Sequence, residues 1–176
     1  MAMFAGAKVV FALTATAAGA TGAAVAGEPV SLHRLLPGHH APAPSGAGCS
    51  TAVGRAVCSA TRDPHIHSAM LLGALLEGGN LTGPWACGDG GWSCGPWQIN
   101  RSVHHSVSRA EAQDPRFAAA YMLPAYTAGC RAVPVLRWRT DPRAAAAECA
   151  YRAERPARMY PTARVNAAWT RLGGTT

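Results

Sequence analysis

Apolar residues recur at helical spacing through the middle of the chain and predict a series of helices. The clearest helix begins at Asp63-Pro64, because Asp is a favoured N-cap and Pro a favoured first helical residue. Its apolar positions follow a helical repeat: Ile66, Met70, Gly73 and Leu76. We expect this helix to end at Glu77, where Gly78-Gly79 stops it.

Further helix signals follow along the chain. Asp114-Pro115 and Asp141-Pro142 each open a helix in the same way, and Ser108 with Glu111 has the spacing of a capping box. A final helix is expected over about 161–172. Strand signals are weak, since a proline interrupts the short run of strand-forming residues. The sequence therefore predicts a mainly α fold with long loops.

The N-terminal part predicts export. Lys8 precedes an apolar run, Val9–Ala26, which ends in a small-x-small pattern typical of a signal peptidase site. A retained membrane anchor is the alternative, but the glycines and threonines in the run favour cleavage after Ala26. Residues 27–48 are rich in proline and glycine and are interpreted as a linker or arm. The folded domain is expected over 49–176.

All the cysteines follow the predicted signal: Cys49, Cys58, Cys87, Cys94, Cys130 and Cys149. An even number in an exported chain indicates disulfide bonds. Several pairings are possible, and pairing of sequence neighbours would give 49–58, 87–94 and 130–149. The spacing does not fit a zinc site, so we expect no metal.

The chain is basic, with sixteen Lys and Arg residues against nine Asp and Glu. A basic exported protein suits an anionic polymer through electrostatic steering. Bacterial cell wall and nucleic acid are both such polymers. No basic stripe interleaved with aromatic residues points to nucleic acid, which we therefore exclude as a partner.

Glu77 is the first candidate for catalysis. It ends an otherwise apolar helix, where partial removal from water and the negative end of the helix dipole both favour a protonated carboxyl. Such an acid can donate its proton to a glycosidic oxygen. The ordinary alternative is a solvated glutamate at a helix end.

The residues after Glu77 give this position its context. A glycine-rich loop, Gly88-Asp-Gly-Gly91, is followed by Gly95-Pro-Trp-Gln-Ile99, and Asp114-Pro115 and Tyr121-Met-Leu123 come later. Over about 65–160, this order resembles the lysozyme-like superfamily, which includes soluble lytic transglycosylases and goose-type lysozymes. The resemblance implies a lysozyme-like fold and a cofactor-free enzyme that cleaves the glycan strands of peptidoglycan.

The resemblance also implies roles for individual residues. Glu77 would protonate the leaving oxygen and then act as a base. Gln98 would contact the bound sugar, although a hydrogen bond within its loop is an equal alternative. Trp97 would stack on a sugar or pack in the core, and the same two alternatives hold for Trp92. A tyrosine is expected to support the site, and Tyr151 is favoured over Tyr126 because it follows the Asp-Pro helix.

A second carboxylate would decide the chemistry. Most other acids are explained as helix caps or lie in the arm, which leaves Asp89, Glu148 and Glu154. Asp89 lies in the glycine loop near Cys87 and could face Glu77, whereas Asp-Gly also favours a simple turn. With a facing carboxylate, hydrolysis is expected. Without one, the N-acetyl group of the sugar would assist, and a transglycosylase that forms an anhydro end is then an equal alternative to a hydrolase.

We therefore expect a secreted or cell-wall-associated monomer that acts on peptidoglycan and keeps no stable membrane association after signal cleavage. The rival hypothesis is a non-catalytic wall-binding or secreted interaction protein on the same scaffold.

Overall fold

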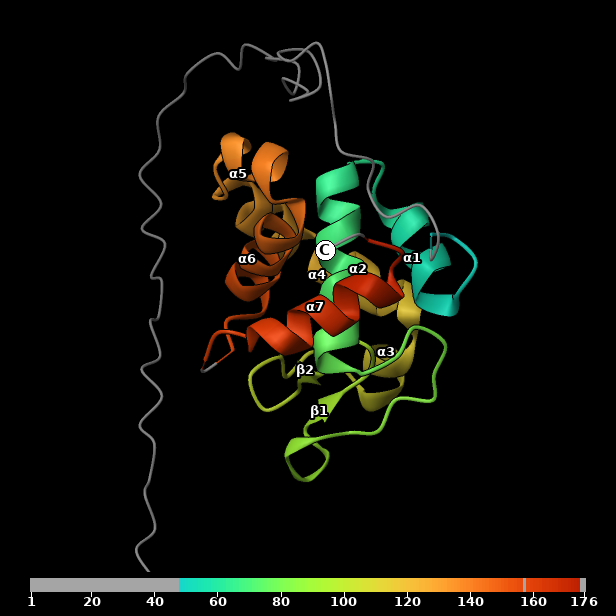
Figure 1. Cartoon of the computed structure of the whole chain (residues 1–176). Coiled ribbons are helices and arrows are strands. Elements are labelled where there is room, and N and C mark those ends of the chain that lie inside the picture. Colours follow the sequence, from blue (N-terminus) through green and yellow to red (C-terminus); the bar gives the residue numbers. More distant parts are fainter. Residues whose placement is uncertain (1–47, 157, 175–176) are drawn as a thin grey trace, which may run out of the picture. The chain divides into compact units, whose positions relative to one another are not determined.

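A computed structural model describes residues 48–156 and 158–174. The predicted signal peptide lies outside the described residues, and so does the predicted arm apart from Gly48. The described chain is mainly helical, which confirms the predicted fold class at this level (Figure 1). The elements in order are α1 (Ala52–Ala60), α2 (Pro64–Glu77), η2 (Asp89–Gly91), β1 (Ser93–Cys94), β2 (Ile99–Asn100), α3 (Arg109–Gln113), α4 (Pro115–Arg131), α5 (Val135–Thr140), α6 (Pro142–Glu154) and α7 (Thr162–Arg171).

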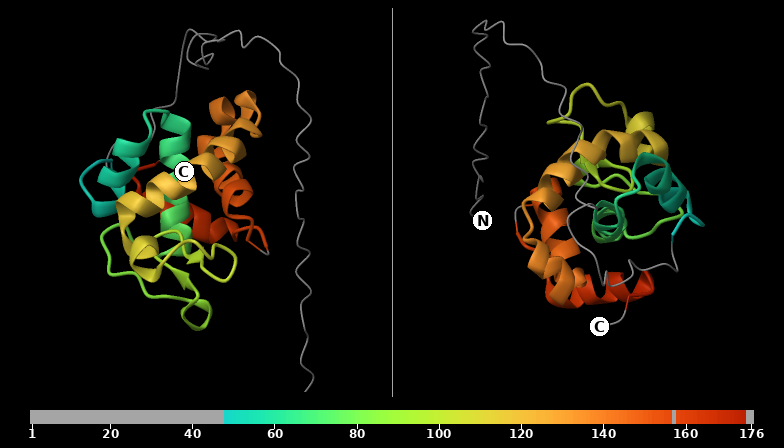
Figure 2. Two further views of the ribbon diagram at one scale, coloured as in Figure 1. Left: turned by 180° about the vertical axis from the view of Figure 1, so that it is seen from behind. Right: turned by 90° about the horizontal axis from the view of Figure 1, so that it is seen from above.

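The central element is α2, which the other long helices surround. In the view from above in Figure 2, α2 is seen nearly end-on, with α1, α4, α6 and α7 arranged around it. All of its residues from Ser68 to Leu76 are buried. A helix that is apolar on every side is stable only inside such a ring of helices. Glu77 thus stands where the buried helix reaches the surface.

Side-chain caps fix the starts of the helices where the sequence predicts them. Asp63 Oδ1 accepts from the backbone N–H of His65 at 2.9 Å, and Asp141 Oδ1 accepts from that of Ala144 at 2.9 Å. Asp114 caps α4 in the same way, and the capping box at Ser108 has both of its hydrogen bonds. Each cap satisfies backbone donors that have no partner inside the helix.

Two helices differ from the sequence-based expectation, and a third continues further than expected. No helix is predicted where α1 forms, and the weak strand signal over 133–136 is not borne out, because Val135 and Leu136 begin α5 instead. α4 continues through Pro124 to Arg131. The residues after Pro124 matter for the candidate active site, because they bring Tyr126 into the core beside α2.

Disulfides join Cys49 to Cys58, Cys87 to Cys94 and Cys130 to Cys149. Pairing between sequence neighbours is therefore confirmed. The second bond closes the glycine-rich loop, beside the short antiparallel pair β1–β2 in which Cys94 lies opposite Ile99. The bonds are compatible with a protein folded in an oxidising compartment. None of the described helices has both the length and the apolar character needed to cross a bilayer.

Candidate active site

Glu77 is the last residue of α2 and is partly exposed. The hydroxyl of Tyr160 donates a hydrogen bond to Glu77 Oε1 at 2.7 Å. Tyr160 lies in the segment between α6 and α7, and it reaches Glu77 because α6 ends sharply at Arg155, whose φ of 49° is left-handed. The tyrosine on Glu77 is thus Tyr160, which no sequence pattern singled out.

Tyr151, the predicted supporting tyrosine, makes no hydrogen bond to Glu77. It lies on α6, is partly exposed, and its hydroxyl makes no hydrogen bond to any residue that the structure describes. The hydroxyl bound to Glu77 comes from the segment after α6 rather than from α6 itself, and a substrate contact of Tyr151 stays a prediction.

Arginine side chains of α7 donate hydrogen bonds to backbone carbonyls at the C-terminal end of α2 and form no ion pair with Glu77. Arg164 donates to the carbonyl oxygen of Leu76, and Arg171 donates to that of Gly79 at 3.0 Å. In Figure 1, α7 crosses the lower part of α2, where these contacts form. Guanidinium groups there satisfy free carbonyls and oppose the negative end of the helix dipole. Glu77 has no ion pair with any described residue.

A second carboxyl, Glu154, lies in the same cluster at the end of α6. The hydroxyl of Tyr126 donates to Glu154 Oε1 at 2.6 Å. The pKa of Glu154 is raised to about 8, mainly because the carboxyl is removed from water. The hydrogen bond from Tyr126 lowers this pKa, and the negative charge of Glu77 raises it. Two carboxyl groups of the site therefore interact electrostatically.

Gly73 makes room for this arrangement. A Cβ on Gly73 would lie 1.8 Å from the hydroxyl oxygen of Tyr126, far inside contact distance. Gly73 precedes Glu77 by four residues and so shares its face of α2. The Tyr126 hydroxyl therefore lies against the strip of α2 that leads to Glu77, with Glu154 bound to it.

Both tyrosines are kept neutral. Burial raises the pKa of Tyr126 and of Tyr160, and the charges of Glu77 and Glu154 raise both further. The positive charge of Arg164 opposes the shift in the pKa of Tyr160. Neutral hydroxyls remain hydrogen-bond donors, and a donor of this kind holds a carboxyl in one orientation.

Asp89, the predicted second carboxylate, is a turn residue. It is exposed, has a positive φ of 50°, and accepts a hydrogen bond from the hydroxyl of Ser93 at 2.6 Å. The Asp-Gly turn was the alternative explanation, and it describes what is observed. The carboxyl that interacts with Glu77 is Glu154.

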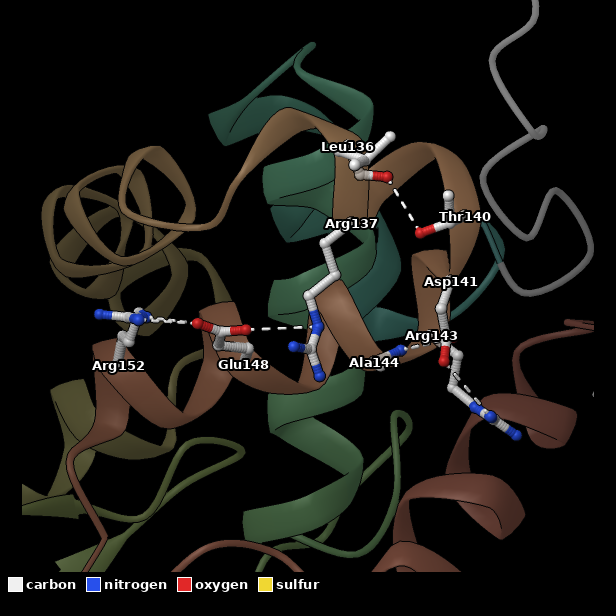
Figure 3. A network of polar contacts seen from close by, with 8 residues as sticks. All are labelled: Leu136, Arg137, Thr140, Asp141, Arg143, Ala144, Glu148 and Arg152. Carbon is white, nitrogen blue, oxygen red and sulfur yellow. Dashed lines mark hydrogen bonds and ion pairs between the residues drawn. The ribbon is translucent and has the colours of Figure 1, made fainter.

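Glu148, the third unassigned acid, belongs to a surface network of ion pairs. Figure 3 shows it between Arg137 and Arg152, at 3.4 Å and 2.7 Å. Asp141 lies nearby in the same view, where it caps Ala144 and pairs with Arg143 at 3.6 Å. Arginine contacts thus account for Glu148, whereas Glu154 has no ion pair among the described residues.

The side chains of Trp97 and Gln98, which were predicted to contact the sugar, make hydrogen bonds within the protein. Trp97 is only 1% exposed, and its indole N–H donates to the carbonyl of Met70 at 3.0 Å, so packing replaces the predicted stacking role. The side-chain amide of Gln98 bonds to the backbone of Gly88, Ala86 and Gly95. This is the loop role that was the equal alternative.

Trp92 is the aromatic side chain that faces solvent in this region. It is 52% exposed, and the Arg101 guanidinium carbon lies 5.9 Å from the centre of its ring. Of the two tryptophans that the sequence offered for sugar stacking, Trp92 is therefore the exposed one and Trp97 the buried one. Within the described ranges, no group of His, Cys, Asp and Glu side chains is arranged to hold a metal ion.

Comparison with protein-family models, with curated proteins and with solved structures found no match to this chain. Function is therefore inferred from the geometry of the cluster that Glu77, Glu154, Tyr126 and Tyr160 form, which we call the carboxyl cluster.

Proposed function

We propose that the protein is an exported glycosidase that cleaves the glycan strands of peptidoglycan, on a lysozyme-like fold, with Glu77 as general acid and base. The observation that supports this most is the carboxyl cluster. A partly exposed carboxyl ends a buried helix, a neutral tyrosine orients it, and no arginine of the described chain neutralises it. A solvated surface glutamate needs none of these features.

The proposed reaction follows from the position of Glu77 and of the Tyr160 hydroxyl that donates to it. Glu77 protonates the glycosidic oxygen, and the bond from that oxygen to the anomeric carbon breaks. The resulting Glu77 carboxylate accepts the hydrogen bond from Tyr160 and then takes a proton from the next nucleophile. A hydroxyl donor at this point stabilises the negative charge as it develops.

The nucleophile decides between hydrolysis and transglycosylation. The raised pKa of Glu154, about 8, keeps its carboxyl protonated at neutral pH, and the Tyr126 hydroxyl already donates to it, so Glu154 is poorly placed to activate an attacking water. Asp89 is exposed but bound into its own turn. Assistance by the N-acetyl group of the substrate, followed by attack of a sugar hydroxyl, is then the favoured route. We therefore favour a lytic transglycosylase that leaves anhydro ends over a muramidase.

A non-catalytic wall-binding protein is the second candidate. The observation in its favour is that Trp97 and Gln98 are engaged within the fold and leave Trp92 as the open aromatic surface of this region. This candidate requires no protonated carboxyl, whereas the enzyme does.

Clearing of cell-wall suspensions separates the two. The wild-type protein and Glu148→Gln, which changes only the surface network, should both clear the suspension. Glu77→Gln should bind wall and keep its circular dichroism spectrum but clear nothing. Equal clearing by Glu77→Gln would exclude Glu77 as the acid.

A further inference from the structure

An exposed aromatic side chain and a positive charge lie together in the β1–β2 hairpin. Trp92 is 52% exposed. The backbone N–H of Arg101 donates to the Trp92 carbonyl at 3.0 Å, which continues the register in which Ser93 pairs with Asn100. Side chains of directly opposite residues project from the same face of an antiparallel pair. The Arg101 guanidinium carbon accordingly lies 5.9 Å from the centre of the indole ring, within the range of a cation–π contact.

The charge of Arg101 has no partner in the part of the chain that the structure describes. The guanidinium takes part in no ion pair or hydrogen bond there, and its Nε is removed from solvent without an acceptor. Asp89, the acid of the adjoining turn, accepts from the Ser93 hydroxyl instead. A buried donor without an acceptor costs free energy, so this position favours a ligand that brings an acceptor and a negative charge.

The hairpin also connects this pair to the end of α2. Its turn packs against the residue after Glu77, since a Cβ on Gly78 would lie 2.9 Å from Pro96 Cα. Trp92 precedes Pro96 by four residues, so their Cα atoms are at most about 14 Å apart. A glycan strand that is bound at Glu77 and runs along the hairpin therefore reaches Trp92 within a few sugar units.

An indole face with a guanidinium beside it fits a sugar that carries a carboxylate. The apolar face of a sugar ring packs on the indole, and the guanidinium binds a carboxylate through paired N–H donors. In peptidoglycan, the lactyl carboxyl of N-acetylmuramic acid is uncharged where it forms an amide with a stem peptide. It is a carboxylate where that amide has been hydrolysed. The positive charge of Arg101 therefore favours glycan without stem peptides.

We propose that Trp92 and Arg101 form a subsite for N-acetylmuramic acid residues with a free carboxylate, so that the protein acts best on glycan strands without stem peptides. The class of reaction that supplies this substrate is hydrolysis of the amide between glycan and stem peptide. The inference rests on the proposed function, because it names the form of the glycan that is cleaved at Glu77.

Calorimetric titration with a matched pair of tetrasaccharides tests the subsite. Both alternate N-acetylglucosamine with N-acetylmuramic acid, and the lactyl groups are free carboxylates in one and primary carboxamides in the other. Titration into Glu77→Gln avoids cleavage during the measurement. This protein should bind the carboxylate form about three- to tenfold more tightly than the carboxamide form, as expected for a partly exposed charged pair.

Second substitutions in the Glu77→Gln protein assign the preference. Arg101→Gln should bring the ratio of the two affinities to about one, whereas Arg101→Lys keeps the charge and should keep part of the preference. Trp92→Ala should weaken the binding of both forms by a similar factor, about two- to tenfold. Arg139→Gln removes an equal charge from α5, which Figure 1 shows at the end of the helical domain away from β1 and β2, and should change neither affinity.

Equal affinity of the Glu77→Gln protein for the two forms, or no binding of either, would overturn the inference. A preference that survives Arg101→Gln would overturn it as well. Cleavage by the wild-type protein is scored separately. A preference for the carboxylate form without any cleavage would refute the proposed function and support the subsite, whereas cleavage without the preference would support the function and refute the subsite.

Discussion

Gly73→Ala should destabilise the protein, although alanine normally stabilises a helix. In an ordinary helix interior, replacing glycine with alanine gains about 1 kcal/mol. Here the added Cβ would lie 1.8 Å from the Tyr126 hydroxyl oxygen and 3.0 Å from ring carbon Cζ, so the ring must move. Movement of the ring breaks the 2.6 Å hydrogen bond to Glu154.

The size of the destabilisation follows from two costs, overpacking and a lost hydrogen bond, set against the gain in helix propensity. Overpacking of a tight core costs about 1 to 3 kcal/mol, and loss of a hydrogen bond to a carboxyl costs about 1.5 to 3 kcal/mol. After the gain in helix propensity is subtracted, Gly73→Ala should lower the free energy of unfolding by about 1.5 to 5 kcal/mol. The substitution should also reduce wall cleavage, because it displaces a member of the carboxyl cluster.

Urea unfolding with the disulfides intact measures this loss, and a double-mutant cycle with Tyr126→Phe assigns it. Phenylalanine lacks the hydroxyl that meets the new Cβ, so Gly73→Ala should cost at least about 1 kcal/mol less when Tyr126→Phe is already present. A Gly73→Ala protein as stable as the wild type, or more stable, would refute the packing of Tyr126 on α2. Strict additivity in the cycle would show that the cost arises elsewhere.

Stability should also depend on pH through Glu154, and two further substitutions test the roles of Asp89 and Trp97. The folded-state pKa of Glu154 is raised, so the stability it contributes is fully present below its unfolded pKa of 4.5 and is lost as pH rises to about 8. The slope should be at most about 1.4 kcal/mol per pH unit in urea melts, and it should flatten in Glu154→Gln. Asp89→Asn should keep at least about half of the wall-clearing rate, because a residue bound into its own turn contributes little to the reaction. A loss of rate as large as that of Glu77→Gln would show that Asp89 takes part in the reaction. Trp97→Phe should cost about 1 to 3 kcal/mol of stability by removing a buried hydrogen bond and part of a fully packed side chain, and an unchanged urea midpoint would contradict its core role.

Local signals predicted much of the scaffold. The Asp-Pro pairs and the capping box mark helix starts because their side chains satisfy donors within a few residues. The disulfides also join sequence neighbours. By contrast, α4 continues through Pro124, where tertiary packing overrides the local preference against proline.

The carboxyl cluster was only partly predictable. Glu77 could be chosen because it follows an apolar helix and precedes a glycine loop. Glu154 was one of three acids without a role and was not chosen, because its environment depends on Tyr126, which is 28 residues away in the sequence. One local signal was present: Gly73 lies four residues before Glu77 in a helix of large side chains, where it admits the Tyr126 hydroxyl.

Tyr160 is the residue of the carboxyl cluster that the sequence was least able to predict. It is separated from Glu77 by 83 residues and lies in a segment without regular structure, so neither periodicity nor spacing marks it. Its position depends on the left-handed turn at Arg155 and on the docking of α7 against the end of α2. Contacts of this kind follow from the whole fold rather than from any short pattern.

Mass spectrometry of digested peptidoglycan tests the central claim most directly. The wild-type protein should release muropeptides with new anhydro ends, and Glu77→Gln should release none while still binding the wall. Reducing ends in place of anhydro ends would make the protein a hydrolase and leave Glu77 as its acid. New glycan ends of either kind from Glu77→Gln, in the same amount as from the wild type, would contradict the account.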